Sequence, residues 1–166
     1  RLLGTLSREQ PNSLILVPEL LQVLVVAAER GSPPPSALQF VAVGGARVSR
    51  ELLARADAAG IPVYEGYGLS ECASVVCLNT PAARRTGTVG RPLPHVRVRV
   101  DASGQVHVAG NTMLGYLGDP PRAPHDPIAT GDLGVFDADG YLQLHGRMGN
   151  RFITGFGRNV SPEWVE

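Results

Sequence analysis

The sequence contains no lysine, because all fifteen of its basic residues are arginine. A mechanism that requires a lysine ammonium group must therefore take it from outside these 166 residues. Fifteen acidic residues balance the arginines, and neither sign forms a long block. This balance argues against a nucleic-acid partner and against a polybasic membrane patch.

Cysteine is also scarce. Cys72 and Cys77 are too few for a disulfide framework and lack the spacing of a metal site. Buried thiols in a reducing compartment explain them best, so the sequence predicts a cytoplasmic protein.

Long hydrophobic runs are missing as well. The longest apolar stretch, Leu14–Ala28, is interrupted by Pro18, Glu19 and Gln22, so it is too short and too polar for a transmembrane segment. The apolar content of 43% is that of a globular chain. Because the chain starts at Arg1 without a signal-peptide pattern and ends inside a patterned segment, we expect it to be a fragment of a longer protein.

Strand and helix patterns alternate over residues 1–85. Three short apolar runs predict strands, the first of them buried: Ser13–Val17, Leu38–Val43 and Ile61–Tyr64. Apolar residues at helical spacing follow Pro18, and a second helix is expected between an N-cap at Ser49 and a glycine cap at Gly60. This order predicts a parallel α/β unit.

Period-two alternation replaces this pattern over residues 86–147. Three alternating runs predict strands: Val96–Val100, Gln105–Ala109 and Tyr141–His145. Turn signals at Asp101–Gly104 and Asp137–Gly140 indicate antiparallel hairpins. The predicted fold class is therefore α/β, with a parallel α/β unit followed by a small antiparallel, barrel-like β subdomain. Residues 148–166 are predicted to be a hinge and the start of a further domain.

The segment Tyr64–Glu71, YEGYGLSE, follows the third predicted strand. Ligands of open α/β sheets bind beyond the carboxyl ends of the strands, and two glycines there let the backbone approach a ligand. Tyr67 offers a flat face, Ser70 a hydroxyl for a phosphate, and Glu71 a hard oxygen ligand for a divalent cation. An ordinary glycine-rich turn with a surface acid explains the segment equally well.

Two later segments carry weaker signals. Thr130–Asp132 predicts a tight turn whose carboxylate accepts both hydroxyls of a ribose, although this tripeptide occurs in many turns. Arg147 precedes a glycine-broken apolar run that is typical of a hinge, and a hairpin with a solvated arginine is the alternative. Residues 118–127, with four prolines, are predicted to form a surface loop. All four histidines are predicted at surface or strand positions without a catalytic role: His95, His107, His125 and His145.

In this order, the motifs resemble the adenylate-forming superfamily. That superfamily contains acyl- and aryl-CoA ligases, peptide-synthetase adenylation domains and firefly-type luciferases. The resemblance extends from Val17 to Glu166 and rests on YGLSE at 67–71, GTVGRPLP at 87–94, TGD at 130–132, and GR at 146–147 with a trailing GRNVSPE at 157–163.

The resemblance implies an ATP-dependent acid–thiol ligase that forms an acyl-adenylate and then an acyl-CoA, on a fatty or related carboxylic acid. ATP or AMP, Mg2+ and coenzyme A are implied as cofactors and co-substrates. Matching positions imply these nucleotide-binding residues: Gly44, Gly45, Ala46, Glu65, Gly66, Tyr67, Gly68, Ser70, Asp132 and Arg147.

The resemblance also implies a role for each of five residues. Tyr67 would lie against the adenine ring, and Ser70 would touch the α-phosphate, where many members have threonine. Asp132 and Arg147 would reach the ribose. Glu71 would bind Mg2+, and Ser70 and Glu71 are the implied catalytic pair.

Departures from the family's pattern limit what this chain does alone. Gly149 and Asn150 stand at the hinge, where members usually have an acidic pivot residue. The family's phosphate loop would lie before Arg1, and its catalytic lysine after Glu166. The isolated chain is therefore predicted to be inactive and to bind nucleotide weakly.

Three other interpretations remain open at this point. The chain could belong to an adenylation domain of a peptide synthetase, or to a non-catalytic adenylate-binding module. The motifs could also be accidental in an unrelated α/β fragment. Neither the acid nor the oligomeric state follows from the sequence.

Overall fold

The structure is a computed structural model that describes residues 2–123, 125–149, 152–153 and 159–160. In chain order the first elements are α1 (Leu2–Glu9), β1 (Ser13–Leu16), α2 (Pro18–Glu29), β2 (Phe40–Val43), α3 (Arg50–Ala58), β3 (Val63–Leu69), the 3-10 turn η1 (Ser70–Cys72), β4 (Ser74–Leu78) and β5 (Arg91–Pro92). They are followed by β6 (Arg97–Val100), β7 (Gln105–Ala109), β8 (Ile128–Phe136), β9 (Leu142–Arg147), β10 (Phe152–Ile153) and β11 (Asn159–Val160). Among the described residues, none of the helices combines the length and the apolarity that a membrane span requires.

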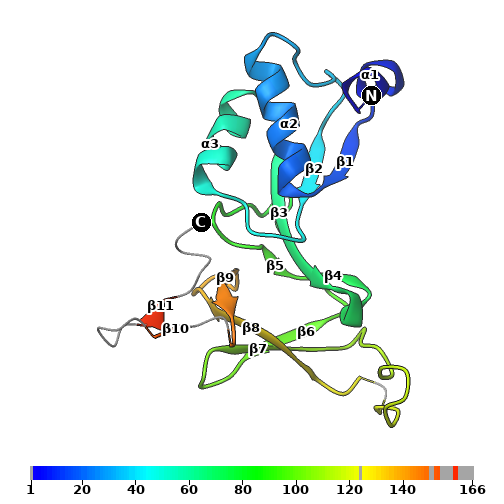
Figure 1. The fold of residues 1–166 in the computed structure, drawn as a ribbon, viewed down its shortest axis with the longest axis vertical. Coiled ribbons are helices and arrows are strands. Elements are labelled where there is room, and N and C mark those ends of the chain that lie inside the picture. Colours follow the sequence, from blue (N-terminus) through cyan, green and yellow to red (C-terminus); the bar gives the residue numbers. More distant parts are fainter. Residues whose placement is uncertain (1, 124, 150–151, 154–158, 161–166) are drawn as a thin grey trace.

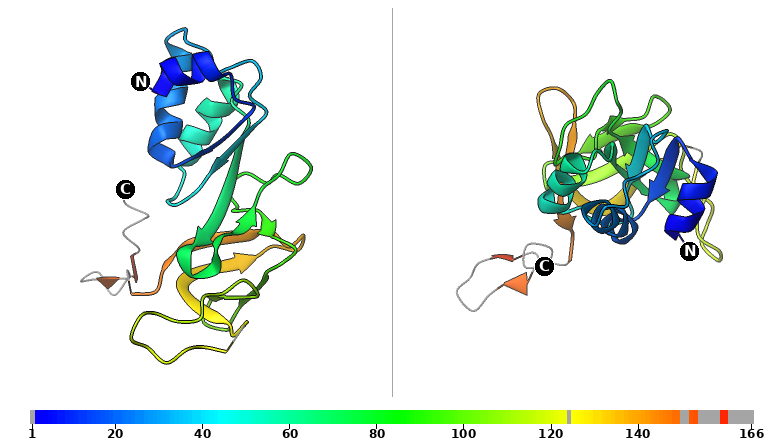
Figure 2. Two further views of the ribbon diagram at one scale, coloured as in Figure 1. Left: turned by 90° about the vertical axis from the view of Figure 1, so that its right-hand side faces the viewer. Right: turned by 90° about the horizontal axis from the view of Figure 1, so that it is seen from above.

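The first sheet has the strand order β1-β2-β3-β4-β5. Strands β1, β2 and β3 are parallel, whereas β4 and β5 continue the sheet in the antiparallel sense. Helices α2 and α3 lie together on one side of the parallel strands (Figures 1 and 2). Pro18 occupies the first turn of α2, and the Ser49 hydroxyl caps α3 by accepting the Leu52 N–H at 3.1 Å. These features confirm the predicted parallel α/β unit.

The prediction that the first strand is buried is wrong. In β1 only Leu16 is buried, and the side chain of Ile15 is 88% exposed. The helices cover one face of the parallel strands, so alternate side chains of β1 point to the open face. On that open face Phe40 and Tyr64 stack with their ring centroids 4.7 Å apart.

The second sheet is antiparallel throughout, with the order β6-β7-β8-β9. Its two predicted turns close with backbone bonds from Gly104 N to Asp101 O at 2.9 Å and from Gly140 N to Asp137 O at 3.1 Å. The sheet is curled, which confirms the predicted small barrel-like β subdomain.

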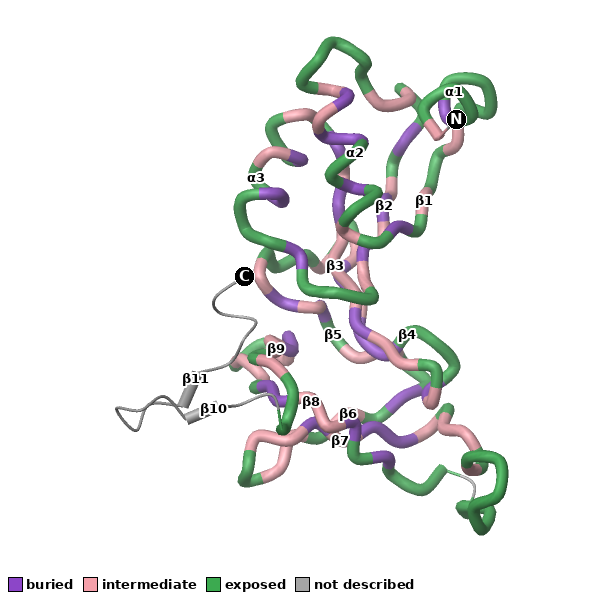
Figure 3. The backbone as a smooth tube through the Cα atoms, in the orientation of Figure 1, coloured by how far each residue is buried: buried purple, intermediate pink, exposed green. Residues whose placement is uncertain are grey.

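Strand β3 connects two hydrophobic cores. Val63, near its start, packs into the core beneath α2 and α3, whereas Tyr67 packs into a second core built largely from β4 and the curled sheet. Figure 3 shows the corresponding buried stretches along the helices, on β3 and β4, and in the lower sheet. One continuous strand therefore fixes the α/β part and the β part relative to each other.

The prediction of a glycine-rich segment that leaves the sheet after residue 64 needs correction. Most of it continues as strand, because β3 runs to Leu69 and pairs with β4. A Cβ atom on Gly68 would lie 1.5 Å from Ser74 O, and one on Gly66 would lie 2.9 Å from Leu78 Cδ1. Glycine is therefore favoured at both positions because the neighbouring strand β4 approaches closely. The strand pairing explains these glycines without a bound ligand.

Candidate functional site

Three predicted site residues meet where the two sheets approach each other. The Tyr67 hydroxyl donates to Asp132 Oδ2 at 2.5 Å, and Arg147 Nε lies 3.1 Å from Asp132 Oδ1. Asp132 and Arg147 are also paired residues of the β8–β9 ladder. The Asp132 side chain is only 16% exposed, whereas that of Arg147 is 63% exposed. The structure thus brings an anchored carboxylate and an accessible guanidinium together.

A bulge in β8 places Asp132. The sequence predicted a tight turn at Thr130–Asp132, but these residues lie inside a strand whose register against β7 shifts there. Gly131 has a φ of +79°, in the left-handed region that favours glycine. The Thr130 hydroxyl donates to Val106 O and accepts the Asp132 N–H, each at 3.0 Å. The carboxylate is therefore held by the backbone of the bulge as well as by its side-chain partners.

Tyr67 is a buried donor. Burial raises the pKa of its hydroxyl above the ordinary value, and the hydrogen bond to Asp132 acts in the same direction. The hydroxyl therefore stays protonated and keeps donating to Asp132. A carboxylate has about four lone-pair sites, so Asp132 can still accept further hydrogen bonds after engaging Tyr67 and Arg147. The predicted contact between the Tyr67 ring and adenine stays a prediction.

Glu71 follows β3 in the turn η1. Its carboxylate Oε1 accepts the Tyr116 hydroxyl at 2.7 Å, and its backbone oxygen accepts the Met113 N–H at 2.8 Å. The hydrogen bond from Tyr116 lowers the pKa of Glu71, and the charge of Arg147 acts in the same direction. Glu71 is therefore ionised at neutral pH, and its carboxylate is stabilised by the charge of Arg147.

This setting suits a weakly chelated Mg2+ ion. Within the described residues there is no group of three or more histidine, cysteine or acidic side chains that could hold a metal. Mg2+ commonly uses only one or two carboxylates together with phosphate oxygens and water. Glu71 is a partly exposed carboxylate with acceptor capacity left after its bond to Tyr116. The donor set therefore fits an ion that arrives with a nucleotide.

Ser70 lies beside Glu71 and is exposed. The turn that follows η1 is tight: Ala73 and Ser74 have φ values of +52° and +80°. Such values are unfavourable for residues with a side chain, and strain of this kind concentrates near functional sites. The turn reverses the chain into β4 and leaves Ser70 and Glu71 at the end of β3.

The remaining predicted positions lie on β3 itself and in the turn after the neighbouring strand β2. Gly44, Gly45 and Ala46 follow β2, and a Cβ atom on Gly44 would lie 3.0 Å from Gly66 O. The Glu65 carboxylate accepts the Gly87 N–H at 3.0 Å, and burial raises its pKa. The side chain of Glu65 thus fixes the connection to β5, and its predicted place in the nucleotide site stays a prediction.

The structure describes one of the two predicted hinge residues. Gly149 is exposed, with a φ of +98°. Asn150, the other predicted hinge residue, lies outside the described residues.

Sequence reasoning missed two residues that organise this region. Asn79 is 1% exposed, its Nδ2 donates to Glu65 O at 3.1 Å and to Thr88 O at 2.7 Å, and its Oδ1 accepts the Arg85 N–H at 2.8 Å. Tyr116 contacts Glu71 from 45 positions along the chain. No local signal marks either residue, because each acts through partners that only the fold brings near.

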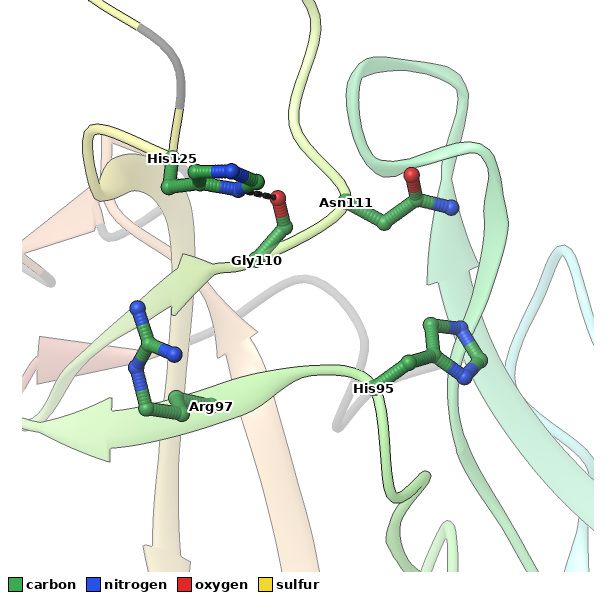
Figure 4. A pocket seen from close by; sticks show the side chains of 5 residues that line it. All are labelled: His95, Arg97, Gly110, Asn111 and His125. Atoms are coloured by element: carbon green, nitrogen blue, oxygen red, sulfur yellow. Dashed lines mark hydrogen bonds between the residues drawn. The ribbon is translucent and has the colours of Figure 1, made fainter.

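A separate cavity of about 470 Å³ lies on the β part (Figure 4). It is lined by His95, Arg97, Gly110, Asn111 and His125, and His125 Nδ1 lies 2.7 Å from Gly110 O. None of the predicted site residues lines it. The four histidines were predicted at surface or strand positions, and His95 and His125 are indeed exposed.

The fold and this site define a class of protein: a mixed sheet with helices on one face, joined to a curled antiparallel sheet whose carboxylate–arginine pair contacts Tyr67 of the first sheet. The family described as "AMP-binding enzyme" matches residues 1–117 of the sequence. The chain belongs to this family, which confirms the resemblance drawn from the motifs.

Relatives and solved structures agree with this assignment. The chain is 34% identical over 128 residues to the long-chain-fatty-acid–CoA ligase FadD15 of Mycobacterium bovis, which covers 74% of this chain and 21% of the relative. It is 31% identical over 148 residues to the 2-succinylbenzoate–CoA ligase of Bacillus mycoides, covering 80% of this chain and 31% of the relative.

Among solved structures, the o-succinylbenzoate CoA synthetase MenE of Bacillus subtilis in complex with the acyl-adenylate intermediate OSB-AMP superposes with a TM-score of 0.85 at 25% identity. The match covers 99% of this chain and 37% of that structure's chain. The chain thus spans between about a fifth and two fifths of the length of these proteins.

Proposed function

We propose that this chain forms part of an ATP-dependent acid–thiol ligase. The enzyme would form an acyl-adenylate from ATP and a fatty or related carboxylic acid, with release of pyrophosphate, and would then transfer the acyl group to the thiol of coenzyme A, with release of AMP. The observation that carries the proposal is that Asp132 contacts both Tyr67 and Arg147, while Glu71 follows Tyr67 by four residues at the end of β3. Membership of the AMP-binding family and relatives named as acid–CoA ligases support the same reaction.

In this proposal Asp132 binds the ribose. Its carboxylate is fixed by Tyr67 and by the β8 bulge, so little further ordering is needed when two ribose hydroxyls donate to it. Arg147 would bind the sugar from the accessible side of the same carboxylate. Tyr67 would lie against the adenine ring. The neighbouring residues of β3 and the turn after β2 would line the rest of the adenine site: Gly44, Gly45, Ala46, Glu65, Gly66 and Gly68.

Glu71 and Ser70 would serve the phosphates. Bound to Glu71, Mg2+ would neutralise charge on the phosphate groups, which is the main requirement of phosphoryl-type chemistry. The hydroxyl of Ser70 would donate a hydrogen bond to an oxygen of the α-phosphate. The chain supplies no lysine, so any ammonium group at the reaction centre must come from residues beyond it.

Enzyme assays of the full-length protein test this function. A panel of fatty and aromatic acids, with pyrophosphate release as readout, should show acid-dependent turnover that requires Mg2+ and ATP. Glu71→Gln should lower kcat about 100-fold or more, by analogy with the loss of other charge-stabilising groups. Glu29→Gln is the matched control, because Glu29 pairs with Arg55 on the surface, Nε to Oε1 at 2.8 Å. Full-length protein that releases no pyrophosphate with any acid would contradict the proposal.

The isolated chain offers a complementary measurement. It should show no turnover and no micromolar ATP or AMP site by isothermal calorimetry, because the family's phosphate loop and catalytic lysine are not in its sequence. We also propose a cytoplasmic location, in which the free, buried thiols of Cys72 and Cys77 remain reduced.

A further inference from the structure

The loop between β7 and β8 contacts Glu71 at two points. Met113 N–H donates to the Glu71 backbone oxygen at 2.8 Å, and the Tyr116 hydroxyl donates to Oε1 at 2.7 Å. The first bond fixes the backbone of Glu71 and the second fixes its side chain. The loop therefore determines both the position and the orientation of the carboxylate.

Packing does not account for the place of Tyr116. The residue is 59% exposed, and its neighbours Leu114 and Leu117 are 61% and 107% exposed. Met113, in contrast, packs against the second core and anchors the loop. Internal bonds from Asp119 N to Tyr116 O at 3.1 Å and from Arg122 N to Leu114 O at 2.6 Å shape the segment that carries the tyrosine. The loop is thus held in place by Met113 and by its internal hydrogen bonds, and it places the exposed Tyr116 side chain with its hydroxyl against Glu71.

We propose that Tyr116 is a positioning residue for the metal site: its hydroxyl holds the Glu71 carboxylate in one orientation for the Mg2+ that accompanies the nucleotide. The inference rests on the proposed function of Glu71. A phenol that donates to one carboxylate oxygen leaves the remaining lone pairs of the group available to a cation. Hydrogen-bonding partners of this kind orient metal-binding carboxylates, and their loss typically weakens metal affinity about 10- to 100-fold.

The test is Tyr116→Phe in the full-length protein. Phenylalanine keeps the ring and removes only the hydroxyl. The Mg2+ concentration that gives half-maximal pyrophosphate release should rise about 10-fold, whereas kcat at saturating Mg2+ should stay near the wild-type value. Electron paramagnetic resonance of Mn2+ in the presence of ATP supplies a readout independent of turnover, and it should show the same loss of affinity.

Two variants serve as controls. Tyr64→Phe removes a phenol from a ring that stacks on Phe40, and Leu117→Ala changes an exposed side chain of the same loop. Both should retain the wild-type Mg2+ dependence. In a Glu71→Gln background, Tyr116→Phe should have no additional effect on Mg2+ or Mn2+ affinity, because the tyrosine would act on the metal only through the Glu71 carboxylate, which this variant lacks.

The outcomes separate the two proposals. Wild-type protein without Mg2+-dependent turnover contradicts the proposed function. Active wild-type protein with unchanged metal affinity in Tyr116→Phe overturns the positioning role. Tighter metal binding in that variant overturns it too, since it would mean that the tyrosine competes with the ion.

Discussion

The α/β part and the β part of the molecule each have a hydrophobic core, but they differ in the contacts that supplement it. In the α/β part, apolar side chains of the helices, such as Leu21 on α2 and Leu53 on α3, are fully buried in the core between the two helices and one face of the sheet. In the β part and at its junction with the first sheet, close backbone contacts and polar clamps are prominent, as at Gly68 and Asn79. The fold of the α/β part therefore follows from the periodicity of its apolar residues, whereas the geometry of the site depends on specific contacts between residues that are distant in the sequence.

The largest expected loss of stability comes from replacing a glycine that the neighbouring strand contacts closely, in comparison with a glycine that has open space around it. Gly68→Ala would bring a Cβ atom to 1.5 Å from the backbone oxygen of Ser74, so β3 and β4 must separate. We expect a loss of about 3 kcal/mol in the free energy of unfolding. Gly60→Ala, at the end of α3, has open space and only an unfavourable φ of +70°, so about 1 kcal/mol is expected. Urea unfolding compares the variants, and equal losses would remove the distinction.

Asn79→Ala compares the stability that a buried hydrogen-bonding side chain contributes with the stability that a buried apolar side chain contributes. Removing the amide leaves Thr88 O and Arg85 N without their buried partner, so we expect a loss of about 2 to 3 kcal/mol. Leu53→Ala in the first core should lose a similar amount, about 3 kcal/mol. The same unfolding experiment checks both. A neutral Asn79→Ala variant would show that the junction does not depend on this clamp.

Ser49→Ala tests local structure in the α/β part. The Ser49 hydroxyl accepts the Leu52 N–H, so its loss should lower stability by about 1 kcal/mol. Ser36→Ala, at an exposed loop position, is the control and should change stability by about 0.5 kcal/mol or less. If both serines gave the same small effect, the cap would contribute nothing measurable.

Asp101 gives the corresponding test in the β part, with the smallest expected effect. Hydrogen bonds from Ser103 and His107 lower the pKa of Asp101 in the folded state. Because the folded pKa is below the unfolded value of about 3.9, the group contributes stability above about pH 4, and this contribution is lost as the pH falls further. Asp101→Asn should therefore flatten the decline of the unfolding midpoint as the pH falls below about 4. An unchanged pH profile would contradict this assignment.

Much of the fold follows from the sequence because neighbouring residues determine it. Helical spacing after Pro18 and the N-cap at Ser49 predicted α2 and α3, and period-two alternation predicted β7 with its correct ends. The burial of β1 was predicted wrongly because the apolar run does not reveal that helices cover only one face.

Motif order singled out Tyr67, Glu71, Asp132 and Arg147 as residues of the candidate site, but it did not predict their conformations. Asp132 was expected on a tight turn and Arg147 directly before a hinge, whereas both lie on paired strands. Tyr67 and Asp132 lie 65 positions apart, and their contact depends on a strand and a bulge that local sequence does not specify. For the same reason Tyr116 was assigned no role.

The most direct test of the account is AMP binding to full-length protein by isothermal calorimetry, comparing wild type with Asp132→Asn. Asparagine preserves the shape of the side chain but removes the negative charge and replaces one acceptor oxygen with a donor NH2 group. The two ribose hydroxyls would then lose a charged acceptor, so we expect AMP to bind about 100-fold more weakly. Asp57→Asn, which removes a surface partner of Arg84, should leave the affinity unchanged. Equal affinities of wild type and Asp132→Asn for AMP would contradict the claim that this cluster is the nucleotide site.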